Sequence, residues 1–155
     1  MSSAASKTTE QAAQDALATA AGSAQVGATS APMPELNGLI LQLPGAAPLY
    51  LVLNAYRCWI PDPQTLQNLF IPGATITPSI NIGVVSEGAA LTSGAVLVQG
   101  DASPQVYLVS NGVKMWIPDE ATLNRYQFSK AQIQIVPQVV IDFLPNGPNV
   151  QEPTS

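Results

Sequence analysis

The chain contains two copies of one motif, 57 residues apart. The first copy begins at Tyr50 and the second at Tyr107, and ten of the eighteen residues in 50–67 are identical to their counterparts in 107–124. Self-similarity of this kind is typical of a duplicated structural unit. We therefore expect two similar halves.

The second copy predicts a tight β-hairpin. Asn111-Gly112 separates two apolar-rich arms, and this dipeptide favours a two-residue type I′ turn because both of its residues tolerate positive φ. Such a turn places Tyr107 opposite Trp116 and Val109 opposite Lys114.

The first copy predicts the same pairing with a less suitable turn. Tyr50 is expected to face Trp59, and Val52 to face Arg57. The turn is Asn54-Ala55, and alanine is less suited than glycine to positive φ. A weaker hairpin or a different turn type is therefore expected in this copy.

The sequence Ile-Pro-Asp follows both hairpins. Asp62 and Asp119 are expected to be helix N-caps, because a short carboxylate accepts hydrogen bonds from the free N–H groups of a first helical turn. Short helices are predicted over 63–70 and 120–127. The alternative, a catalytic pair of aspartates, is disfavoured.

Further strands flank each hairpin. The runs 39–43 and 96–99 precede the hairpins, and 80–85 and 133–144 follow the helices and are rich in β-branched residues. Each unit therefore has the order strand, hairpin, short helix, strand. We predict an all-β fold, β-dominant with short helices, in which the two tandem units pack with pseudo-twofold symmetry.

The chain divides into four parts. Residues 1–37 are dominated by Ala, Ser, Thr, Gln and Gly and are interpreted as a flexible or weakly helical arm. Repeat unit one covers 38–93 and repeat unit two covers 94–149. A polar tail, 150–155, closes the chain.

The composition argues against several function classes. The net charge is −5 with only five Lys plus Arg, so the basic face that nucleic acid requires is missing. The chain has no histidine, which removes Ser-His-Asp and Cys-His nucleophile systems and most zinc sites. We expect no enzyme activity, no cofactor and no metal. The single cysteine, Cys58, is interpreted as a small buried hydrophobe.

The sequence carries no recognisable membrane or export signal. No uninterrupted apolar run approaches the roughly 20 residues of a transmembrane helix. The first fifteen residues lack the basic and apolar regions of a secretory signal. A cytoplasmic location or export by a signal-independent route is expected.

Each hairpin places aromatic and basic side chains on one face. Such a face can stack on a sugar ring or hold a ligand beside a cation. The alternative is a core aromatic pair over which the Lys or Arg lays its aliphatic stem. The candidate ligand-binding residues are Tyr50, Arg57, Trp59, Tyr107, Lys114 and Trp116.

The run Tyr-Leu-Val-x-Asn-Gly-Val-Lys-x-Trp-Ile-Pro-Asp resembles a tandem β-hairpin repeat of bacterial surface and exported proteins of poorly defined role. The resemblance covers 38–149. The stretch 143–147 resembles the Leu-Pro-x-Gly close of that repeat, whereas copy one has Glu87-Gly88 and departs from it. The resemblance implies a non-enzymatic attachment or structural module with no catalytic residues.

Two function hypotheses follow. Two repeats bury only a thin core, and only 10% of the residues are charged, which favours burial against partners. The first hypothesis is a structural or assembly protein, as a homo-oligomer or a subunit of a larger complex. The alternative is a ligand-binding module, for a glycan or cell-surface ligand and as part of a toxin, that uses the paired Tyr/Trp/basic faces.

Overall fold

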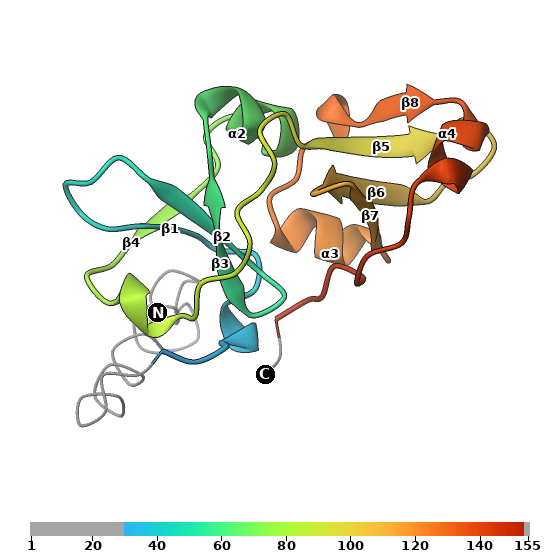
Figure 1. Ribbon diagram of the computed structural model, residues 1–155. Helices are drawn as coiled ribbons and strands as arrows, with labels where there is room; N and C mark the ends of the chain where they lie inside the picture. Colours follow the sequence, from blue (N-terminus) through green and yellow to red (C-terminus); the bar gives the residue numbers. More distant parts are fainter. Residues whose placement is uncertain (1–29, 154–155) are drawn as a thin grey trace, which may run out of the picture.

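The protein is built from two similar four-stranded mixed sheets, which lie side by side in Figure 1. The computed structural model describes residues 30–153, so most of the expected arm and the last two residues lie outside the described range. The strand orders are β3-β2-β1-β4 and β7-β6-β5-β8. The β-dominant fold with short helices is confirmed, and the shared topology agrees with a tandem repeat.

The first unit pairs β2 antiparallel with both β1 and β3, and pairs β4 parallel with β1. Its elements in chain order are η1 (Pro34–Leu36), β1 (Ile40–Gln42), β2 (Leu49–Leu53), β3 (Tyr56–Ile60), α2 (Pro63–Leu69), β4 (Ile76–Pro78) and η2 (Ile82–Val84), the η elements being 3₁₀ helices.

The second unit repeats these pairings, with β6 antiparallel to β5 and β7 and with β8 parallel to β5. Its elements are β5 (Val96–Gly100), β6 (Val106–Ser110), β7 (Val113–Ile117), α3 (Glu120–Arg125), η3 (Lys130–Gln132), β8 (Gln134–Val136) and α4 (Gln138–Phe143).

Both hairpins have the predicted register: Tyr50 pairs with Trp59, and Tyr107 with Trp116. The two turns also share one backbone conformation. In the first turn Asn54 and Ala55 have φ of 50° and 82°; in the second, the corresponding values are 56° and 76°. A different turn type in the first copy is therefore wrong. The weaker hairpin stays a prediction.

Both predicted N-caps are confirmed. Asp62 Oδ1 accepts hydrogen bonds from the main-chain N and the Oγ1 of Thr65, at 2.8 and 2.7 Å. Asp119 Oδ1 accepts the same pair from Thr122, both at 2.8 Å. Each carboxylate thus begins its helix and orients the threonine of the first turn.

The strands predicted after the helices are partly wrong. The last strand of unit one is β4, which ends at Pro78, and the run 80–85 contains the 3₁₀ helix η2 instead. In unit two the strand is limited to β8, because Pro137 follows it and starts α4 at φ −55°. Proline lacks the N–H that a strand needs but suits a helix start, so it overrides the β-branched composition of 138–143.

The two sheets share one hydrophobic core. It contains fully buried residues of both units, including Ile40, Leu51, Leu97 and Leu108. A second, smaller cluster covers the other face of the first sheet, where η1 and η2 contribute Leu36 and Ile82. Residues 30–37, which the sequence assigns to the arm, thus pack on the first sheet as far as Met33 and Leu36. The units form one folded body.

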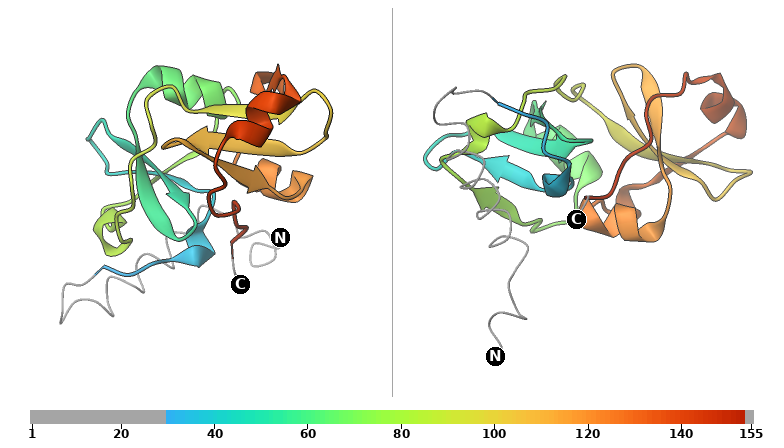
Figure 2. Two further views of the ribbon diagram at one scale, coloured as in Figure 1. Left: turned by 45° about the vertical axis from the view of Figure 1, so that its right-hand side comes forward. Right: turned by 90° about the horizontal axis from the view of Figure 1, so that it is seen from below.

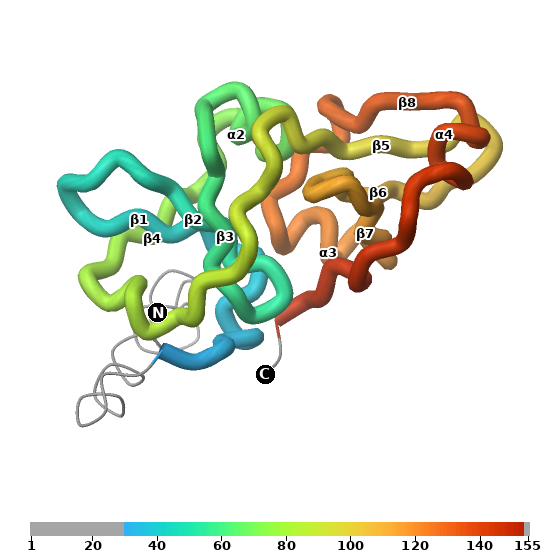
Figure 3. Tube along the Cα trace, viewed as in Figure 1, coloured from blue at the N-terminus to red at the C-terminus, as the bar shows by residue number. Residues whose placement is uncertain are grey.

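The chain leaving each unit returns to the hairpin of the other. Asn54 Nδ2 donates to Asn149 O at 2.8 Å, and Asn111 Nδ2 donates to Ala90 O at 3.1 Å. The tube in Figure 3 shows the C-terminal segment running from α4 back to the first unit. This exchange has the reciprocity expected of a pseudo-twofold pair.

Candidate functional site

The four aromatic candidates form two cross-strand pairs, one in each hairpin. Trp59 is 41% exposed. Tyr50, Tyr107 and Trp116 are half-buried. The aromatic surface that reaches solvent is therefore unequal in the two units, and Trp59 offers most of it.

The basic candidate of unit two points into the protein. Lys114 is only 8% exposed, and its Nζ donates to Ile141 O at 2.8 Å and to Leu144 O at 2.6 Å. These carbonyls belong to the last turn of α4, where a cation is favoured by the helix dipole. The same Nζ lies 5.7 Å from the centroid of the Tyr107 ring. Lys114 therefore holds α4 in place, and its ammonium group is occupied.

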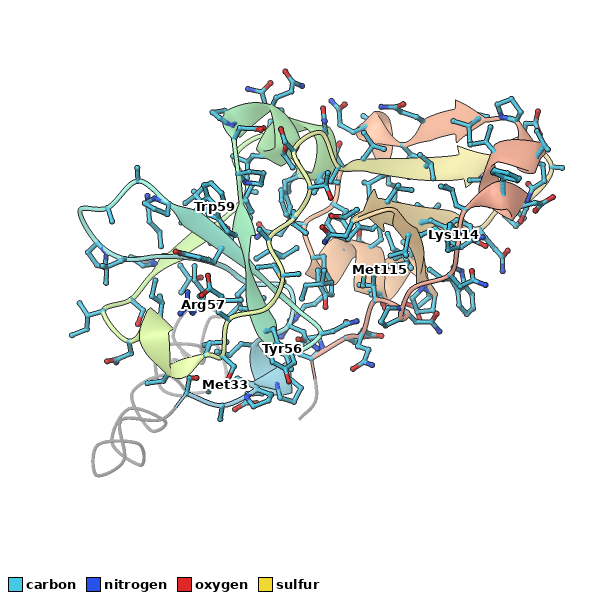
Figure 4. The ribbon with its side chains drawn as sticks, viewed as in Figure 1. Met33, Tyr56, Arg57, Trp59, Lys114 and Met115 are labelled. Atoms are coloured by element: carbon cyan, nitrogen blue, oxygen red, sulfur yellow. The ribbon has the colours of Figure 1, made fainter. Side chains whose placement is uncertain are left out.

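Arg57 has the corresponding place in unit one. Its Nε donates to Val85 O at 2.8 Å, at the end of η2, and its guanidinium carbon lies 5.1 Å from the Tyr50 ring centroid. The guanidinium also lies 3.9 Å from the carboxylate of Glu87. Figure 4 shows Arg57 and Trp59 on the same strand, and Lys114 beside α4. The structure thus brings each cation to its tyrosine and gives it a helix end as partner.

The tryptophans line two equivalent grooves at the open ends of the hairpins. The Trp59 groove has a volume of about 340 Å³ and includes Pro48, Pro61 and Leu66. The Trp116 groove has a volume of about 430 Å³. All nine residues that line the first groove have their counterparts, 57 residues further on, in the lining of the second. The hollow is a property of the repeat.

The two grooves differ in charge at one rim. Glu120 forms an ion pair with Lys130 beside the Trp116 groove. The position of Glu120 is occupied by Pro63 in the Trp59 groove, where Asp62 is the single charged residue. The Trp59 groove is therefore the more apolar of the two, and the Trp116 groove offers both signs of charge.

The sequence gave only part of this lining. Its interpretation identified the tryptophans but assigned the Ile-Pro-Asp run and Leu66 to capping and packing. The shared Ile-Pro-Asp of both copies was the available signal, since a motif that only capped a helix would not require Ile-Pro before the aspartate. The cations Arg57 and Lys114, by contrast, do not line either groove.

The titratable groups show no arrangement for acid–base chemistry. A hydrogen bond from the Ser93 hydroxyl, followed by those from Thr65, lowers the pKa of Asp62. The pKa of Asp119 is lowered by the main-chain N–H of Thr122 and then by its hydroxyl. Burial raises the pKa of Cys58 to about 11, which keeps this thiol protonated and unreactive at neutral pH. The interpretation of Cys58 as a small buried hydrophobe is confirmed by its 6% exposure.

Comparisons of the chain with known protein families, with characterised proteins and with solved structures find no match. Within 30–153, no three His, Cys, Asp or Glu side chains gather as a metal site would require. Over the same range, none of the helices is both long and apolar enough to span a bilayer. The chemistry offered by the described residues is therefore that of binding surfaces.

Proposed function

We propose that the protein is a non-enzymatic structural subunit that associates with a second copy of itself through the outer edge of unit two. The observation that carries this proposal is an exposed apolar surface on β8 and α4. Phe143 is 90% exposed, Val139 69% and Ile135 63%, with Val140 at 44%. Contiguous exposed apolar side chains of this size mark interaction sites. We call these four residues the α4 surface.

The main chain beside the α4 surface supports a strand-pairing contact. Val136 O accepts a hydrogen bond from Asp101 N at 2.9 Å, so residue 136 directs its polar groups at the second sheet. Alternate residues of a strand point their N–H and C=O groups in opposite directions. The polar main-chain groups of Ile135 therefore face outward, at the open edge of the sheet, where another strand can pair.

Unit one offers no equivalent edge. The residue of β4 that corresponds to Ile135 is Pro78, and proline cannot donate a main-chain hydrogen bond. Only one of the two related edges therefore suits strand pairing. A β8-to-β8 contact between two copies uses the same patch on both, and such a contact closes at a dimer.

Size-exclusion chromatography with light scattering tests this proposal. At about 100 μM, a dimer of the 16.1 kDa chain is expected for wild type. Phe143→Ser should lower the mass to that of the monomer because it removes the most exposed member of the surface. Ile80→Ser, at a 78% exposed apolar residue of unit one, is the matched control and should leave the dimer intact. A wild-type monomer at that concentration would refute the proposal.

The two tryptophan grooves favour a second candidate, a ligand-binding module for a glycan or cell-surface ligand. Half-exposed tryptophan beside proline gives the flat apolar platform on which a sugar ring stacks. The resemblance to a bacterial surface repeat supports the same function and an attachment role.

Intrinsic fluorescence tests this second candidate directly. The chain has two tryptophans, and both line grooves, so a bound glycan should shift the emission. Trp59→Phe and Trp116→Phe, made singly, assign the shift to one groove. A glycan panel that leaves the emission unchanged, or a shift that survives in both variants, would count against this function.

A further inference from the structure

Arg125 is the one cation among residues 30–153 whose side chain has no partner in the protein. Lys114 donates to two helix carbonyls, Arg57 to Val85 O, and Lys130 pairs with Glu120. The guanidinium of Arg125 makes no hydrogen bond or ion pair within the described range. In a chain with so few basic residues, an unpaired guanidinium is the strongest available site for an anion.

This guanidinium lines the cleft between the two repeat units. The cleft has a volume of about 590 Å³ and is formed by the first sheet, by α3 and by the end of the described chain. Figure 2 shows, in the view from below, the C-terminal end lying between α3 and the first unit. Its polar lining consists of Thr75, Thr77, Asn124, Arg125, Gln127 and Glu152. We call it the Arg125 cleft. Ligand sites occur preferentially at such junctions between packed units.

The walls of the Arg125 cleft are tied together across the junction. Gln127 has a left-handed backbone, with φ of 60°. Its Oε1 accepts from Thr75 N at 2.6 Å and its Nε2 donates to Thr75 O at 3.0 Å. This double hydrogen bond fixes the end of α3 against the start of β4. The cleft is therefore pre-formed.

A close main-chain approach also fixes the base of the arginine. Gly38 has φ of 93°, and a Cβ atom there would lie 2.8 Å from Arg125 O. Only glycine allows the first sheet to come this near to α3. The Cα of Arg125 is thus held firmly while its guanidinium stays unpaired.

The equivalent junction on the other side of the molecule is closed. Asn68 and Ala95 are the counterparts of Arg125 and Gly38, 57 residues earlier and later in the chain respectively. Asn68 Nδ2 donates to Ala95 O at 3.2 Å. One helix end therefore uses its polar side chain to join the units, whereas the other presents a free guanidinium to a cleft.

The charges in the Arg125 cleft define the ligand class. A guanidinium recognises a carboxylate through two parallel hydrogen bonds. Glu152 lines the same cleft, and the chain carries a net charge of −5, so phosphates and other polyanions are repelled. A carboxylate at Glu152 instead favours an ammonium group. We propose that the Arg125 cleft binds a small amino carboxylate, such as a free amino acid, with its carboxylate on Arg125 and its ammonium group at Glu152.

Nuclear magnetic resonance titration with the common L-amino acids tests this site. Binding of at least one of them, with a Kd of about 1 mM or tighter, should shift the side-chain Nε–H resonance of Arg125. The matching amine without a carboxylate, and inorganic phosphate, should not shift it. If no amino acid shifts this resonance at about ten times that concentration, or if phosphate shifts it equally, the proposal is overturned.

Three variants separate binding from folding. Arg125→Gln should weaken the best ligand by about tenfold or more, and Arg125→Lys should weaken it less, because the charge is kept but the fork is lost. Glu152→Gln should weaken amino acids while improving the corresponding hydroxy acids. Lys130→Gln, at an exposed cation outside the cleft, is the control and should leave affinity unchanged. Unchanged affinity in a folded Arg125→Gln protein would refute the assignment.

Discussion

Asn54 and Asn111 make the same hydrogen bond in opposite directions across the molecule: each holds the chain that leaves the other repeat. Asn54 adds a second bond, because its Oδ1 accepts from Gln151 N at 2.8 Å. The segment after unit two therefore mirrors the linker after unit one. Together they close the two repeats into a ring-like pair, although two repeats alone bury a thin core.

Replacing Asn54 tests this closure. Asn54→Gly should lower the free energy of unfolding by about 1–2 kcal/mol, because two side-chain hydrogen bonds are lost while glycine keeps the positive φ of the turn. Urea unfolding measures the change. Asn54→Asp is the matched variant: it keeps the acceptor for Gln151 N and should cost less. Equal stability of Asn54→Gly and wild type would show that the clasp contributes nothing.

The turn of the first hairpin makes a separate prediction. Ala55 has φ of 82°, a conformation that costs an L-residue about 1–2 kcal/mol. Ala55→Gly should therefore raise the urea midpoint, by a net of about 0.5–1 kcal/mol after the added chain entropy of glycine. Gly112→Ala, at the equivalent position of unit two, should lower it. Two changes of the same sign would contradict the matching turn conformations.

The N-cap aspartates predict an acid-dependent loss of stability. The pKa of both carboxyls is lowered in the folded protein, so the ionised form is bound more tightly there than in the unfolded chain. Their contribution is fully present above the ordinary aspartate pKa of about 4 and is lost as the pH falls below it. Asp62→Asn should flatten this part of the stability curve, measured by urea unfolding between about pH 7 and pH 2.5.

A second measurement distinguishes the two caps. The Ser93 hydroxyl is the largest cause of the lowered pKa of Asp62, and Asp119 has no such partner. Ser93→Ala should therefore move the pKa of Asp62 upward and leave that of Asp119 unchanged, as followed by the side-chain carboxyl resonances. If both move together, a general electrostatic change and not the local hydrogen bond is responsible.

The sequence predicted what is decided by neighbouring residues. The hairpin registers follow from the turn dipeptides, and the helix starts follow from Asp62 and Asp119, since these interactions span only a few residues. The 57-residue offset also predicted two similar units. Within that range, local rules were sufficient.

The rest depends on residues that are distant in the chain. After the last strand of each unit the offset becomes 59, as the equivalent contacts of Gly88 with Arg57 O and of Gly147 with Lys114 O show. The added residues accompany α4 in unit two, whose first N–H is bound by Asp101 from the β5–β6 connection. The Arg125 cleft likewise requires elements of both units, and no periodicity in one segment announces it.

Lys114 provides the last prediction, because its partners were invisible in the sequence. Lys114→Met keeps the aliphatic stem but leaves Ile141 O and Leu144 O without their shared donor. The free energy of unfolding should fall by about 1–3 kcal/mol, the cost of buried polar groups left without a partner.

The location of the effect matters more than its size. Hydrogen exchange should accelerate first in α4, since the lost bonds hold only its last turn, while the amides of β6 and β7 keep their protection. Lys114→Arg is the control, because unit one uses Arg57 for the corresponding carbonyl of Val85, and it should restore much of the protection. Uniform loss across the second sheet would show instead that Lys114 supports the hairpin itself. The dimer expected from the α4 surface should weaken in parallel with α4 protection, because a frayed helix no longer presents Phe143 beside β8.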